Sequence, residues 1–149
     1  MRIKQLLMDI QQKILNIENK NKEKVFKFFD LWNKNVMYLV KEQPFDSPAV
    51  FIEILPITWN TLSARQKEQM AEITFRLHIV SRFYSQTHST SPIQSEALDY
   101  LELGDKVRRT LHGTRINNTA TIIHVSSSFD VSHDTYIQSI EDYRCVVKM

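Results

Sequence analysis

Apolar residues recur at helical spacing in two stretches of the chain. Over residues 3–18 and 92–112 they fall three or four positions apart, with polar residues between them. The second stretch has helix-start signals, because Ser91 is a candidate N-cap, Pro92 falls at the first helical position and Gln94 completes a capping box. Gly113 provides a left-handed stop. The pattern predicts two long helices.

A period of two marks the clearest strand, at residues 71–79. The apolar positions are Ala71, Ile73, Phe75, Leu77 and Ile79, and the polar ones between them are Glu72, Thr74, Arg76 and His78. One face of this strand is therefore expected to be buried and the other wet. On this pattern His78 is exposed to solvent or to an interface.

The remaining segments complete the predicted fold. Strands are predicted at 24–32, 49–55, 120–127 and 142–148, while 36–40 fits either a strand or a helical turn and 60–67 reads as an exposed connection. Segment 49–55 is apolar on both faces and is expected inside the sheet. Together these elements predict an α+β fold: a mainly antiparallel sheet of about four to six strands, with two long helices, about 3–18 and 92–112, packed on one face.

Length and composition narrow the class of protein. The 149 residues fit one domain, 1–149, and a net charge of +2 from 19 basic and 17 acidic residues is too balanced to demand a nucleic-acid or membrane partner. No window approaches the ~18 apolar residues of a membrane span. Two glycines are too few for a phosphate-cradling loop, and a single cysteine indicates a reducing, intracellular site of synthesis.

No residue pattern indicates catalysis. None of the five histidines is paired with another at metal-ligand spacing. His133 and Asp134 could form a base with its orienting group, but no nucleophile is near them in the sequence. Cys145 is favoured as a buried structural thiol. We therefore expect a protein that is not an enzyme and has no cofactor or metal site.

Two groups of residues are candidates for contact with other chains. Trp59 and Leu62 follow an apolar strand and stand beside basic residues, so they belong either to the core or to a protein interface. The polar row of strand 71–79 mixes charge signs and faces either water or a partner. The candidate contact residues are Trp59, Leu62, Arg65, Lys67, Glu72, Arg76 and His78.

The order of these segments resembles that of the tail terminator proteins of long-tailed bacteriophages and prophages, also called tail completion or minor tail proteins. The resemblance runs through most of the chain and matches least at 19–47. The resemblance rests on the following segments: the helix 3–17, the strands "PAVFIEILPITW" (48–59) and "ITFRLHIV" (73–80), the helix 95–113, the polar stretch 126–136 and "DYRCVV" (142–147).

The resemblance implies a homo-oligomeric ring, commonly a hexamer, at the head-proximal end of a phage tail. Such a ring stops polymerisation of the tail tube and offers a surface for head–tail joining. The implied partners are further copies of the chain, the tail tube protein and a head-completion or connector protein. The implied location is the virion, after synthesis in the bacterial cytoplasm. Another neck or connector protein, a nucleic-acid-binding module and a small enzyme are the alternatives, of which a clustered basic face would favour the second.

Overall fold

The computed structural model describes residues 2–33, 45–63, 65, 67–82, 87–116, 121–130 and 136–148. The expectations for 36–40 and for His133 and Asp134 lie outside these residues. The elements are α1 (Arg2–Leu15), β1 (Phe28–Leu31), β2 (Ala49–Ile54), β3 (Thr58–Ser63), β4 (Glu68–Arg82), α3 (Gln94–Ala97), α4 (Tyr100–Leu111), β5 (Ile123–Asp130) and β6 (Tyr136–Lys148).

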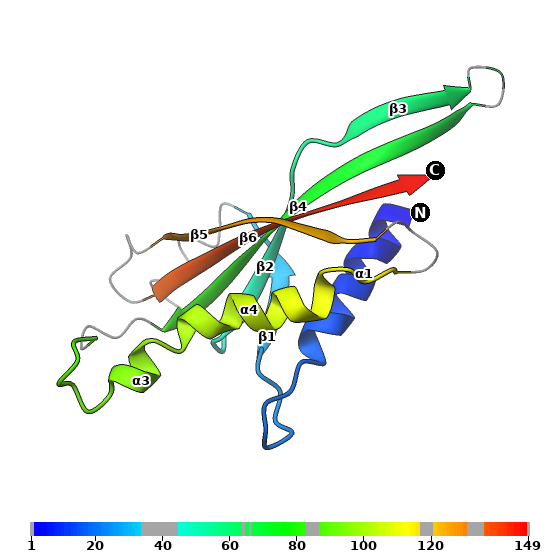
Figure 1. Ribbon diagram of the computed structural model, residues 1–149. Helices are drawn as coiled ribbons and strands as arrows, with labels where there is room; N and C mark the ends of the chain where they lie inside the picture. The colour runs from blue at the N-terminus through cyan, green and yellow to red at the C-terminus, as the bar shows by residue number, and fades with distance from the viewer. Residues whose placement is uncertain are drawn as a thin grey trace.

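The strands form one six-stranded sheet built around β4. Its order is β1-β2-β4-β6-β5, and β3 pairs with β4 beyond the end of β2. The pair β1–β2 is parallel and the others are antiparallel. The 15 residues of β4 reach about 50 Å at ~3.3 Å per residue. The β3–β4 hairpin consequently projects beyond the helices, as Figure 1 shows.

The predicted fold class is wrong. The sheet is mixed, strands outweigh helices, and the described residues form three helices, of which α3 has four residues. The predicted long helices 3–18 and 92–112 do not form as such. The first ends at Leu15, and the second is divided at Leu98 and Asp99. Leu98 has ψ near 0°, which turns the chain and separates α3 from α4.

The predicted start of the second helix is also wrong. Ile93, not Ser91, precedes α3 and makes no side-chain capping bond. The Ser91 hydroxyl instead accepts a hydrogen bond from the Ile93 N–H at 3.3 Å, and the Ser91 carbonyl accepts one from the Gln94 N–H. Such local bonds favour a turn over a helix. The predicted stop is confirmed, because Gly113 has a φ of +80°.

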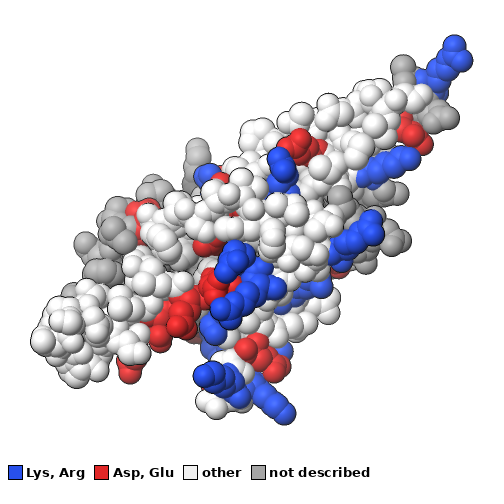
Figure 2. Space-filling model, viewed as in Figure 1, with Lys and Arg blue, Asp and Glu red and all other residues white. Residues whose placement is uncertain are grey.

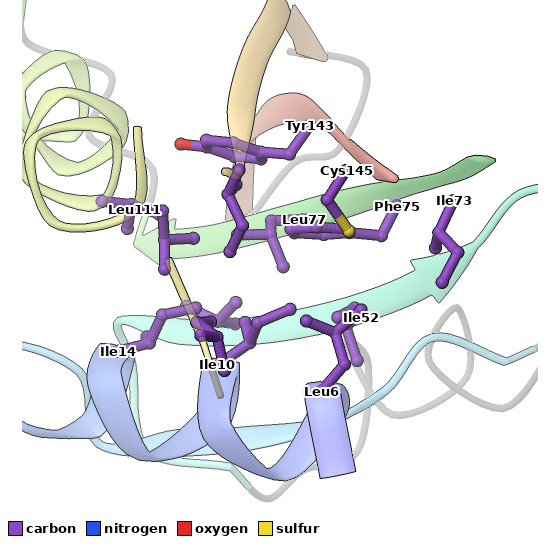
Figure 3. Packing of buried hydrophobic residues seen from close by; sticks show 14 of the residues in the cluster. Leu6, Ile10, Ile14, Ile52, Ile73, Phe75, Leu77, Leu111, Tyr143 and Cys145 are labelled. Carbon is purple, nitrogen blue, oxygen red and sulfur yellow. The ribbon is translucent and has the colours of Figure 1, made fainter. Parts of the chain in front are cut away.

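The main core lies between one face of the sheet and the helices α1 and α4, and we call this the helix face of the sheet. Leu6, Ile10 and Ile14 of α1 pack in the same cluster as Val107 and Leu111 of α4. Figure 3 shows the α1 side chains Leu6, Ile10 and Ile14 directed at those of the sheet. The buried row predicted for strand 71–79 is confirmed: Ala71, Ile73, Phe75, Leu77 and Ile79 are all buried. Each large side chain buried here contributes about 1.5–3 kcal/mol of transfer free energy.

A second, smaller core covers part of the opposite face, which we call the outer face. Phe45, Ala49, Phe51 and Val80 are buried there against Phe28, Trp32 and Tyr136. Residues 49–52 are therefore buried on both faces, and β2 lies between β1 and β4, which confirms it as an interior strand. The cluster also buries His78, so the prediction that His78 is exposed is wrong.

Strand boundaries differ from the predictions where burial gives no alternating signal. Segment 60–67 was expected to be a connection, but Thr58–Ser63 forms β3. Five of its six residues are exposed, so no burial pattern distinguishes its two faces. In segment 24–32 only Phe28–Leu31 is a strand, β5 begins at Ile123, and β6 begins at Tyr136. The inward row Tyr143, Cys145 and Val147 of β6 is confirmed.

Candidate assembly surfaces

The projecting β3–β4 hairpin carries two large apolar side chains that are exposed to solvent. Trp59 stands opposite Ala71, and the register of β3 shifts between Thr61 and Ser63, around Leu62. Trp59 is 45% exposed and Leu62 50% exposed. Of the two readings of these residues, core or surface, the structure places both on the surface of the single chain.

The end of the hairpin is basic. Arg65 and Lys67 are both exposed there, and Lys67 adopts a left-handed φ of 54° that completes the turn. Glu68 lies 3.6 Å from the ammonium group of Lys148, which offsets its negative charge. The hairpin end therefore combines exposed apolar and positively charged groups. Figure 2 shows basic side chains at this end of the molecule.

Glu72 and Arg76 take part in ion pairs across the sheet. The Arg76 guanidinium donates two hydrogen bonds to the Asp142 carboxylate, at 2.8 and 3.0 Å. These bonds raise the pKa of Arg76 above its ordinary value, against the opposing effect of burial. Glu72 lies 3.6 Å from Arg144. The polar row of β4 thus pairs with β6 within the chain, and both Glu72 and Arg76 are only partly exposed.

His78 is held inside the outer-face cluster and is 5% exposed. Its ring stacks on Trp32 with centroids 3.6 Å apart. Its Nδ1 lies 3.1 Å from Gln138 Oε1, and its Nε2 lies 3.2 Å from Glu53 Oε2. Burial lowers the pKa of His78, although hydrogen bonds to Gln138 and Glu53 act in the opposite direction. His78 therefore ties β4 to β2 and β6 rather than offering a surface contact.

A second exposed apolar surface lies on α4 and β5, and the sequence reasoning missed it. Leu101 is 46% exposed and Phe129 is 49% exposed. Phe129 meets the ring of Tyr100 edge-on, with centroids 5.9 Å apart. We call Tyr100, Leu101 and Phe129 the α4 surface. A lone aromatic in the serine-rich segment 126–130 was the signal that could have revealed it.

Acidic side chains form a border at the start of α4, where Asp99 and Glu102 line a groove together with Lys24 and Lys106. Glu96, Asp99 and Glu102 are three residues apart, and all are exposed. The pKa of Asp99 is raised, first by partial desolvation and then by the charges of Glu102 and Glu96, while Lys106 opposes the shift. Figure 2 shows acidic side chains gathered near the start of α4. This border is therefore a region of negative charge in which neighbouring carboxylates repel one another.

Ser127, His124 and Glu141 form a hydrogen-bonded group between β5 and β6. His124 Nε2 lies 2.6 Å from Glu141 Oε2 and 3.2 Å from Ser127 Oγ, while the serine hydroxyl donates to the same carboxylate oxygen. A nucleophilic relay needs the serine and the carboxylate on opposite ring nitrogens of the histidine. Here both contact Nε2, so the geometry is that of a structural network.

Glu141 is 4% exposed, and its carboxylate packs against α4 at Gly104. A Cβ atom at residue 104 would contact Glu141 Oε1 more closely than real Cβ atoms approach their neighbours. Gly104 therefore allows α4 to lie close to the carboxylate. The sequence pattern did not show this role, because a glycine inside a helical segment does not indicate which side chain packs against it.

The other candidate groups add no chemistry. Cys145 is buried, which raises its pKa to about 11 and keeps the thiol protonated at neutral pH. Among the described residues, no three His, Cys, Asp or Glu side chains group closely enough to hold a metal ion. In the same part of the chain, no helix is long and apolar enough to cross a membrane.

Comparisons with known proteins do not assign the chain to a family. No family model matches the sequence, and no curated protein matches it. Among solved structures, the chain is similar to one from the virion of a native gene transfer agent particle, with 9% sequence identity and a TM-score of 0.46. The alignment covers 83% of this chain and 79% of that chain. A likeness of this degree carries no argument about function.

Proposed function

We propose that the chain is a structural virion protein that forms a homo-oligomeric ring at the head-proximal end of a phage tail. The ring, a hexamer in this proposal, ends tail tube polymerisation and presents a surface to a head-completion or connector protein. The protein has no catalytic role and needs no cofactor. The resemblance of the sequence to tail terminator proteins supports the location, while the surface of the structure supports assembly.

The observation that carries assembly is the pair of exposed apolar surfaces. Trp59 and Leu62 lie on the projecting hairpin, and Leu101 and Phe129 lie on the α4 surface, all about half exposed. The two surfaces differ in shape and charge, and such patches suit heterologous contacts between successive copies. Aromatic side chains on an exposed projection are also typical of protein interfaces.

A nucleic-acid-binding module is the second candidate, and the charge pattern disfavours it. Arg76, Arg144 and Lys148 are paired with acidic residues on the same sheet. Arg108 and Arg109 both pair with Asp105 on α4. Phosphate binding would instead require a cluster of cations directed at the nucleic acid. Duplex DNA is therefore expected to bind weakly at physiological salt, with no sequence preference.

The experiment that tests the proposed function combines the purified protein with purified tail tubes of a long-tailed phage. Negative-stain electron microscopy is expected to show density at one end of each tube, and tube polymerisation is expected to stop when the protein is added. The control is the Trp59→Ser/Leu62→Ser double variant, which removes the apolar groups of the hairpin. Tubes that keep growing, or that bind the protein along their whole length, would refute tail termination.

A further inference from the structure

The end of the β3–β4 hairpin and the α4 surface lie at different ends of the same sheet. Trp59 stands opposite Ala71, whereas Phe129 stands opposite Ser139, which in turn pairs with Ile79. The stretch of β4 from residue 71 to 79 spans about 26 Å, and β5 and β3 lie on opposite sides of β4. Figure 1 shows the hairpin and α3 at opposite ends of the molecule. One copy therefore cannot close these two surfaces on each other.

The two surfaces are complementary in both polarity and charge. Each offers exposed apolar side chains, Trp59 and Leu62 on the hairpin and Leu101 and Phe129 on the α4 surface. The hairpin end also carries exposed basic groups, and exposed acidic groups lie at the start of α4, next to Leu101 in the sequence. Opposite charges around an apolar centre steer association and set the register of an interface.

The cations at the hairpin end are opposite in charge to the carboxylates at the start of α4. The pKa of Asp99 is raised first by partial desolvation and then by the charges of Glu102 and Glu96, while Lys106 opposes the shift. The nearby Lys24 is engaged with Glu18 at 3.1 Å, and the Lys27 ammonium donates to the Lys24 carbonyl at 2.6 Å. An external cation would therefore relieve the repulsion among the three carboxylates.

We propose that the end of the β3–β4 hairpin of one copy docks on the α4 surface of the next copy. In the contact, Trp59 and Leu62 meet Leu101 and Phe129, while Arg65 and Lys67 face the carboxylates of Glu96, Asp99 and Glu102. Because a different surface is used on each side, the contact is heterologous and propagates around a ring. This inference rests on the self-assembly in the proposed function and specifies the interface.

Charge reversal on each side tests the inference. Arg65→Glu/Lys67→Glu and Asp99→Lys/Glu102→Lys are each expected to weaken assembly on the order of tenfold at low salt. An equimolar mixture of the two variants is expected to assemble again, since each hairpin then meets an oppositely charged α4 surface. The matched control, Lys4→Glu/Lys13→Glu, changes two lysines of α1, a helix that contributes no residue to either surface, and should assemble like the unmodified protein.

A cross-link gives a second readout that does not depend on charge. A Leu62→Cys chain mixed with a Leu101→Cys chain is expected to form a disulfide between copies under mild oxidation, while the buried Cys145 stays unreactive. The control replaces Leu101→Cys by Met8→Cys, an exposed position on α1. A cross-link to residue 8 and none to residue 101 would overturn the inference.

The outcomes separate this inference from the proposed function. If the unmodified protein assembles, but both charge-reversed variants assemble equally well and no cross-link to residue 101 forms, the interface is wrong and the ring stands. If the unmodified protein remains monomeric at every concentration, with and without tail tubes, the proposed function fails and the inference fails with it.

Discussion

At the residue scale, Gly104 of α4 lies against the Glu141 carboxylate, where an added Cβ atom has no room. We expect Gly104→Ala to lower the free energy of unfolding by about 1–3 kcal/mol, because the added methyl group displaces a carboxylate held by His124 and Ser127. Helix propensity alone would favour alanine by about 1 kcal/mol. Urea denaturation measures the difference. A stabilised variant would show that the carboxylate moves aside without cost.

The hydroxyl of Tyr143 is the buried side-chain polar atom that has no hydrogen-bond partner among the described residues. Burial, together with the charge of Glu141, raises the pKa of Tyr143. We expect Tyr143→Phe to raise the free energy of unfolding by about 1 kcal/mol, because it removes an unsatisfied hydroxyl and keeps the ring stacked on Phe75. Thermal melting with Tyr100→Phe as the control measures this. A clear loss of stability would mean that the hydroxyl is satisfied.

His78 makes folding sensitive to acid. Burial lowers its pKa below the ordinary value of 6.5, so the folded chain binds its proton less readily than the unfolded chain. Its contribution to stability is complete above pH 6.5 and is lost as the pH falls below that value. The charges that face it are Glu53, which favours protonation, and Arg76, which opposes it.

The expected result is a free energy of unfolding that declines below pH 6.5, with a smaller decline in His78→Gln. Denaturant titrations at several pH values measure the slope. His88→Gln is the control, because His88 lies at an exposed turn. An unchanged slope in His78→Gln would contradict the assignment of this effect to His78.

At the scale of elements, we expect the exposed side chains of the β3–β4 hairpin to contribute little to the free energy of unfolding of the protein. We expect Trp59→Ser/Leu62→Ser to change the free energy of unfolding by less than about 1 kcal/mol, since both side chains are about half exposed. Phe75→Ala in the core should instead cost about 3–5 kcal/mol. Far-UV circular dichroism and urea denaturation compare the hairpin variant with the core variant. Unfolding of the hairpin variant would place Trp59 in the core.

The sequence predicts those elements whose burial is periodic. The alternation of 71–79 and the inward row of β6 identify the central strands, because one side of each faces the helices. β3 escapes prediction because most of its side chains are exposed and only its pairing with β4 makes it a strand. The sequence does not predict the break between α3 and α4, because the residue at the turn, Leu98, is apolar and continues the helical pattern.

The sequence indicates which strands carry the candidate contact residues, but not which residues pack around them. Trp59 and Leu62 lie where an interface could use them, but Glu72 and Arg76 pair with residues of β6 about 70 positions away in the sequence. His78 is covered by Trp32, which reaches the outer face from beyond β1. Local periodicity assigns a residue to a face of the sheet. It does not show what long-range packing later covers that face.

At the scale of the whole molecule, the central claim is that the chain functions as an assembly of identical copies. Size-exclusion chromatography with multi-angle light scattering, over a wide range of protein concentration, tests it most directly. The account predicts a species with the mass of a closed ring of about six chains, alone or in exchange with the monomer. A strict monomer at every concentration, shifted only by added DNA, would contradict it.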